Sequence, residues 1–196
     1  TVISLDHARC ISMIGVGSRG SEMEYLTHLP PDPDYVTAAV DGYLLKRDSQ
    51  DRKSDEERFS LCLIRGALQN GLKLPESDLH FIHQEWRMPT QAGGGKLDLL
   101  AVDLKTREFV VIELKSSKDK MATRDKNGRD ATEQAVYYAD VLHHFRRELY
   151  PFFNEVAAAS ALVWKAPAAV HPLNLAVDHV PRCEVWTPKF RQVVRQ

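Results

Sequence analysis

Two acids and a lysine stand out as residues that can do chemistry together: Asp98, Glu113 and Lys115. Asp98 lies in the apolar run 97–102, and the other two lie at the end of a second apolar run, 109–114. Charged groups in such surroundings are costly unless they meet a partner or a metal ion. Mg²⁺ prefers carboxylate oxygens, and an ammonium group can stabilise developing negative charge. The three residues therefore predict a site for a divalent cation.

The two apolar runs that carry these residues are separated only by the polar segment 103–108. This gap suits a hairpin and is too short for a helical crossover, so we expect antiparallel strands near the middle of a sheet. Side chains alternate along a strand, which places Phe109, Val111, Glu113 and Lys115 on one face and Val110, Ile112 and Leu114 on the other. The Leu114 carbonyl is thus a candidate third ligand. Asp103 and Glu108 flank the turn, where we expect them to be solvated.

A helix is predicted from Ser54 to about Asn70, with Gly71 as its stop. Its apolar stripe includes Phe59, Leu63 and Ala67, and it would bury Cys62 as well. Glu56 and Glu57 fall in the first turn. Either can be an acid favoured by the helix dipole or an acid that faces the metal, and the sequence does not choose between them.

Further elements follow from the same kind of pattern. Residues 79–87 predict a strand with Phe81, His83, Glu85 and Arg87 on one side and Ile82, Gln84 and Trp86 on the other. Residues 131 to about 149 predict a helix that Pro151 ends and that presents Gln134, Tyr138, Val141 and Phe145 on one face. Segments 160–164 and 183–186 predict two more strands.

The segment between the second strand of the hairpin and the long helix is rich in basic residues. Besides Lys115 it contains Lys118, Lys120, Arg124, Lys126 and Arg129. Such a run can be a solvated loop, or it can hold a phosphate backbone.

Read together, residues 54–165 run helix, strand, strand, strand, helix, strand, and here the sequence resembles the PD-(D/E)XK nuclease superfamily. The matching motifs are Asp98 in Gly95-Lys-Leu-Asp98, and Glu113-Leu-Lys115 as E-x-K. Gln134-Ala-Val-Tyr-Tyr138 resembles the Q-x-x-x-Y element of the RecB-type branch. The resemblance covers somewhat over half of the chain, and Leu97 stands where the family often has proline.

The resemblance implies an α/β, restriction-endonuclease-like αβββαβ core, whose mixed central sheet has helices on both faces. It implies a Mg²⁺- or Mn²⁺-dependent nuclease, with DNA the favoured substrate. Asp98, Glu113, the Leu114 carbonyl and Glu56 would hold the metal. Lys115 would orient the attacking water, and Gln134 and Tyr138 would hold the substrate backbone or the lysine, with Glu57 the alternative acid. Residues 1–53 would then be an N-terminal extension packed on the core 54–165, and residues 166–196 a C-terminal extension with a last strand.

Composition limits the other function classes. An apolar fraction of 43%, a charged fraction of 27% and a net charge of −1 are typical of a soluble globular protein without a global basic field, so attraction to phosphate must be local. The three widely spaced cysteines read as reduced thiols, and no apolar run is long enough for a membrane helix, so we expect a cytoplasmic protein without a membrane partner.

Two alternatives to a nuclease stay open. The first is a non-catalytic module on the same fold that binds nucleic acid or a protein partner, with a homodimer as one such assembly. The second rests on Gly15-Val-Gly17-Ser-Arg-Gly20, which fits G-x-G-x-x-G and is followed by Asp41 at the spacing of a ribose-binding acid. This looks like the opening of a dinucleotide-binding domain, although the hairpin at 97–114 argues against the crossovers that such a sheet needs.

Overall fold

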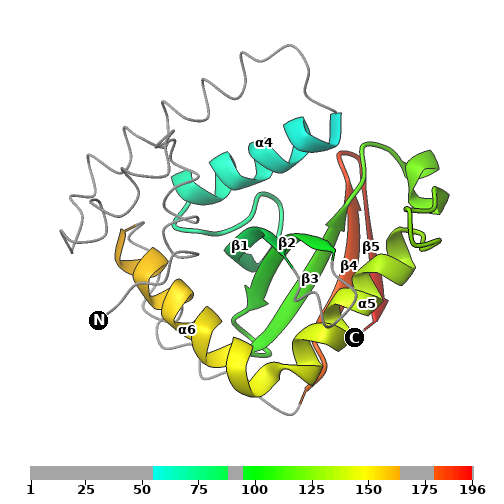
Figure 1. Ribbon diagram of the computed structural model, residues 1–196. Helices are drawn as coiled ribbons and strands as arrows, with labels where there is room; N and C mark the ends of the chain where they lie inside the picture. Colours follow the sequence, from blue (N-terminus) through cyan, green and yellow to red (C-terminus); the bar gives the residue numbers. More distant parts are fainter. Residues whose placement is uncertain (1–54, 88–94, 164–178, 196) are drawn as a thin grey trace, which may run out of the picture.

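The computed structural model describes residues 55–87, 95–163 and 179–195. These residues form an α/β structure with one five-stranded mixed sheet (Figure 1). The elements in chain order are α4 (Asp55–Gln69), β1 (Leu79–Arg87), β2 (Lys96–Asp103), β3 (Glu108–Leu114), the 3₁₀ turn η2 (Lys118–Ala122), α5 (Ala131–His144), α6 (Arg146–Val163), β4 (Arg182–Thr187) and β5 (Phe190–Arg195). The N-terminal segment, including Gly15 to Asp41, lies outside the described residues.

The sheet is ordered β1-β2-β3-β4-β5, with antiparallel pairing except between β3 and β4, which are parallel. The expected hairpin is confirmed: β2 and β3 pair antiparallel, with Leu99 opposite Ile112 and Asp103 opposite Glu108. β3 is therefore an interior strand, which agrees with its apolar residues on both faces.

Helices cover both faces of the sheet, α4 on one and α5 with α6 on the other (Figure 1). Phe109 and Val111 of β3 belong to the core beneath α5 and α6. Val110, Ile112 and Leu114 belong to the core beneath α4, where Leu63, Ile64 and Ala67 meet them. The predicted alternation along β3 is thus confirmed, and Glu113 is set toward the α5 side.

Strand β1 departs from simple alternation because its register shifts between Phe81 and His83. Phe81 pairs with Ala101 and packs beneath α4, whereas His83 pairs with Leu100 and lies edge-on to Phe153 of α6. The expectation that Phe81 and His83 share a face is wrong, because the β-bulge at Ile82 adds one residue to the strand.

The long helix predicted from residue 131 is two helices. The chain turns at Phe145, whose φ of −95° and ψ of 23° end α5, and α6 starts at Arg146 (Figure 1). Pro151 does not end a helix but lies inside α6. The neighbouring Tyr150 and Phe153 are buried against Phe109, with ring centroids 4.8 and 5.7 Å away, and this packing offsets the hydrogen bond that proline removes.

The prediction of a strand at 160–164 is wrong, since residues 160–163 are the end of α6. The strand beside β3 is instead β4, which lies in the segment 166–196 that the sequence sets apart as an extension. Arg182 of β4 bonds to Asp103 at 3.1 Å and to Glu184 at 3.0 Å. Asp103 is accordingly buried rather than solvated, and it also accepts the Lys105 N–H in the hairpin turn.

Helix α4 ends as its sequence predicts. Gly71 has a φ of +55°, and the Leu72 N–H donates to the Ala67 carbonyl at 2.7 Å, which closes a Schellman motif. Cys62 is exposed, contrary to expectation, because the buried face of α4 is centred on Leu63, Ile64 and Ala67. In the described part of the chain, no helix has both the length and the apolar character needed to cross a membrane.

Candidate functional site

The carboxylates of Asp98 and Glu113 lie on adjacent strands at the same end of the hairpin. The pairing of Leu99 with Ile112 makes Asp98 and Glu113 the next facing positions along the antiparallel ladder. Asp98 Oδ2 accepts the backbone N–H of Leu114 at 2.8 Å, and this bond fixes the acid against β3. The Leu114 side chain is buried on the other face, beneath α4.

The ammonium group of Lys115 meets Glu113 on the same face of β3. Lys115 Nζ lies 2.6 Å from Glu113 Oε1, and the two side chains are 12% and 3% exposed. Glu113 Oε2 is buried without a hydrogen-bond partner among the described residues. A buried charged oxygen without a partner is unfavourable, so this atom marks where an additional positive group would be stabilising.

Electrostatics in this cluster favour extra positive charge. Burial raises the pKa of Asp98 to about 6, against the lowering effect of the Leu114 N–H and of Lys115. Burial, followed by the charge of Asp98, raises the pKa of Glu113 well above its usual range. Burial lowers the pKa of Lys115, but the surrounding carboxylates outweigh it and the net shift is upward. One ammonium group therefore does not balance the acids.

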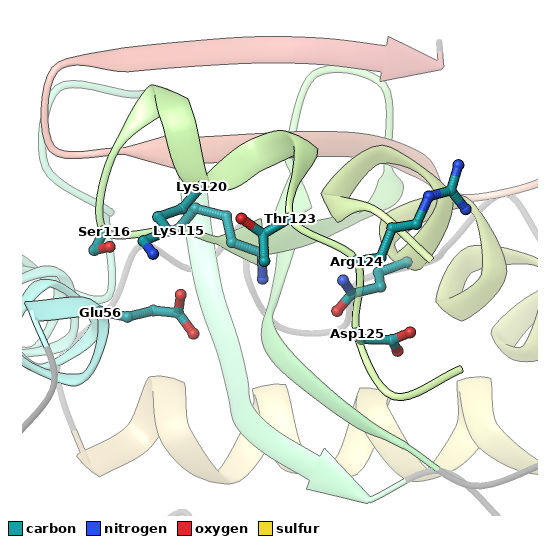
Figure 2. Close-up of a pocket in the computed structure, with 8 residues that line it drawn as sticks. Glu56, Lys115, Ser116, Lys120, Thr123, Arg124 and Asp125 are labelled. Atoms are coloured by element: carbon teal, nitrogen blue, oxygen red, sulfur yellow. The ribbon is translucent and has the colours of Figure 1, made fainter. Parts of the chain in front are cut away.

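A cleft of about 340 Å³ opens beside this cluster, between α4 and the segment that follows β3 (Figure 2). It is lined by Glu56, Lys115, Ser116, Lys120, Thr123, Arg124, Asp125 and Gln134. Glu56 points from α4 into the cleft, and its charge raises the pKa of both Asp98 and Glu113. Glu57 does not line the cleft, so of the two acids that the sequence leaves open, Glu56 is the one at the site.

Gln134 and Tyr138 of α5 are both buried on the side of the helix that faces this region. Gln134 lines the cleft and donates through Nε2 to the Arg129 carbonyl at 3.1 Å. Burial, together with the nearby Glu113, raises the pKa of the Tyr138 hydroxyl to about 12, whereas the Lys96 backbone acts in the opposite direction. Gln134 thus holds a backbone segment that borders the site.

Gly95 allows a close contact between α5 and the chain at the start of β2. Its φ is +123°, and a Cβ there would lie 2.9 Å from Tyr138 Cε1. Only glycine fits both the backbone conformation and the close approach. The sequence gives no sign that Tyr138 lies against Gly95, and this contact is found only in the structure.

The five basic residues of the loop differ in their surroundings. Lys118 lies over the Phe190 ring at 5.0 Å, and Arg129 lies over the Tyr137 ring at 3.5 Å. Arg124 lines the cleft but is 3.5 Å from Glu133, and Lys126 is exposed. Lys120 lines the cleft.

Sequence reasoning did not single out three further cleft residues, Ser116, Thr123 and Asp125. Ser116 directly follows the E-x-K motif, so its position was a usable signal. Asp125 accepts the N–H groups of Asn127 and Arg129 and thereby fixes the conformation of the loop. No local sequence pattern predicts these hydrogen bonds.

Asp98 and Glu113 are the two acids on the paired strands, and Glu56 is a third acid in the adjoining cleft. Among the residues that the structure describes, no group of three or more His, Cys, Asp or Glu side chains could hold a metal ion. Mg²⁺ commonly binds through one or two protein carboxylates and keeps several waters, so the Asp98–Glu113 pair is within its usual range.

Comparison with known proteins does not add to this picture, because no family model, curated protein or solved structure matches the chain.

Proposed function

We propose that this protein is a divalent-cation-dependent nuclease that hydrolyses phosphodiester bonds, with DNA the favoured substrate. One observation carries the proposal. Glu113 is buried beside Asp98, with one carboxylate oxygen on Lys115 and the other without a partner among the described residues. An acid pair and an amine at the mouth of a cleft that basic residues border suit a reaction on a phosphate group.

The residues present fit Mg²⁺ or Mn²⁺. The unpartnered Glu113 Oε2 supplies one hard oxygen ligand, and Asp98 supplies the other. The Leu114 carbonyl is a further candidate ligand, and Glu56 can accept hydrogen bonds from metal-bound water in the cleft. When bound, the cation neutralises charge on the phosphate and lowers the pKa of a coordinated water.

The protein side chains have separate tasks in this proposal. Lys115, held by Glu113 and lining the cleft, donates a hydrogen bond to the substrate phosphate or to the attacking water. Gln134 and Tyr138 act as positioning residues, since Gln134 holds the Arg129 carbonyl and the Tyr138 ring lies against Gly95 at the start of β2.

We further propose that the architecture is the restriction-endonuclease-like fold. In support, α4, β1, β2, β3, α5 and β4 follow one another in the αβββαβ order among the described residues, with the 3₁₀ turn η2 before α5 and the helix α6 after it. The last strand of that series pairs parallel with β3. The strand thus comes from residues 182–187 instead of 160–164.

Cleavage of labelled single-stranded and duplex DNA with Mg²⁺ or Mn²⁺ tests the activity. Glu113→Gln and Lys115→Ala should each lower the rate by about 100-fold or more, because each removes charge from the reacting centre. Asp140→Asn is the matched control, since Asp140 is an exposed acid that pairs with Arg195. Wild-type cleavage that both site variants retain would refute the proposal.

A non-catalytic binding module is the second candidate. It is favoured by the Glu113–Lys115 ion pair, which already satisfies one oxygen, and by the lack of a three-ligand cluster among the described side chains. Titration with Mn²⁺ in a calorimeter separates the two. A nuclease site should bind the ion, with loss of binding in Glu113→Gln, whereas a module of this kind should give no metal-dependent heat.

A further inference from the structure

The five basic residues that follow β3 differ in whether their charge is available to a ligand. Lys118 and Arg129 lie over aromatic rings, and Arg124 bonds to the Gly128 carbonyl and lies near Glu133. Among the described residues, neither the Lys120 nor the Lys126 ammonium has a hydrogen bond or an ion pair, and of these two only Lys120 lines the cleft. Figure 2 shows it pointing into the space between Glu56 and Asp125, while the Arg124 guanidinium points away. Lys120 is therefore the loop cation directed into the cleft.

Other donors surround that ammonium group. Ser116 and Thr123 line the same cleft and carry hydroxyl groups. Asp125 also lines the cleft, and its Oδ1 accepts the backbone N–H groups of Asn127 and Arg129 at 2.8 and 2.9 Å. An ammonium group flanked by hydroxyls is a favourable environment for a phosphate.

The dimensions of the site restrict the form of the substrate. The cleft of about 340 Å³ is at the small end of ligand pockets, and Glu113, which pairs with the lining residue Lys115, is 3% exposed. A flexible single strand reaches a site of this size and depth more readily than a rigid duplex, because it can enter one nucleotide at a time.

We propose that the cleft binds one nucleotide of a single-stranded polynucleotide, and that Lys120 holds its phosphate. This inference rests on the proposed nuclease function. It adds the strand form of the substrate and assigns the phosphate contact to one of the five basic residues.

Binding of a fluorescent single-stranded oligodeoxynucleotide, measured by anisotropy in EDTA over a range of salt concentrations, tests the assignment. Lys120→Ala should weaken binding about tenfold and reduce the slope of log K against log salt by about 0.7, the value for one phosphate contact on a single strand. Lys120→Arg should keep the slope. Lys126→Ala is the matched control, with the same charge change in the same loop at an exposed lysine that does not line the cleft, and should keep the wild-type slope.

The outcomes separate this inference from the nuclease proposal. Equal slopes for Lys120→Ala and Lys126→Ala would overturn the Lys120 assignment, and tighter binding to the matching duplex would overturn the single-strand assignment, even if the protein cleaves DNA. Lys120-dependent binding of the single strand would support the inference even if Mg²⁺ gives no cleavage. The absence of cleavage would count against the nuclease proposal and not against the Lys120 assignment.

Discussion

Replacing Asp98 by asparagine should stabilise the folded protein at neutral pH. The amide oxygen of asparagine can still accept the Leu114 N–H that Asp98 Oδ2 accepts at 2.8 Å. The substitution removes a charge whose pKa burial raises from 3.8 to about 6, with the charge of Glu56 adding to the shift. Ionised Asp98 therefore opposes folding, and a neutral isostere relieves that cost.

The size and sign of this effect follow from the pKa shift. A difference of about 2 pKa units, at about 1.36 kcal/mol per unit, corresponds to about 3 kcal/mol. The unfolded chain ionises Asp98 near pH 3.8 and the folded chain near pH 6, so wild-type stability falls as pH rises through this window. Asp98→Asn lacks that loss. The difference in free energy of unfolding between Asp98→Asn and wild type should reach its full value above about pH 7 and vanish below about pH 4.

Urea unfolding in EDTA at pH 7 and at pH 4 measures both parts of the prediction. At pH 7 we expect the free energy of unfolding of Asp98→Asn to exceed that of wild type by about 3 kcal/mol. Mg²⁺ should reduce this difference, because it binds and stabilises the folded wild type. Asp140→Asn, at an exposed acid, should change stability by less than about 0.5 kcal/mol. An Asp98→Asn variant no more stable than wild type at pH 7, or equally favoured at pH 4, would refute the reasoning.

Three further substitutions test the packing around the site. Lys115→Met should cost about 3 kcal/mol in urea unfolding because it leaves Glu113 buried without its partner, and adding Glu113→Gln should restore most of that loss. Gly95→Ala should cost about 2 to 4 kcal/mol, seen as a lower melting temperature, because its φ is +123° and a Cβ would meet an aromatic ring of α5 at 2.9 Å. Asp103→Ala should cost about 2 kcal/mol in the same assay, because it removes one of the two carboxylates that Arg182 contacts and leaves the Lys105 N–H of the hairpin turn without its acceptor, and a loss below about 1 kcal/mol would contradict the buried network.

The parts of the structure that the sequence predicts are those set by local pattern. The runs 97–102 and 109–114 predict the hairpin because a short polar gap permits no other connection, and strand alternation then places Glu113 and Lys115 on one face. Glycine at position 71 ends α4 for a purely local reason, its left-handed backbone conformation.

The parts that the sequence missed depend on tertiary packing. The short apolar run near residue 160 suits a helix or a strand equally, and burial of Tyr150 and Phe153 carries α6 past Pro151 into it. The strand predicted at 183–186 is confirmed as β4, but its parallel pairing with β3 joins segments far apart in the chain, so no local signal predicts that pairing. The bulge at Ile82 moves His83 to the other face in the same way, through pairing with β2.

At the candidate site, the sequence supplied residue types, and the structure supplied their surroundings. Glu56 and Glu57 are equivalent as helix-start acids, and only the cleft distinguishes Glu56. The basic residues of the loop look interchangeable until their contacts separate Lys120 from the rest.

The central claim is that Asp98 and Glu113 hold one divalent cation. Anomalous diffraction from crystals of the protein soaked in Mn²⁺ tests it directly. We predict a manganese peak within coordination distance of both carboxylates, with Glu113 Oε2 among its ligands. A well-ordered site without that peak, with Lys115 still paired to Glu113, would contradict the account.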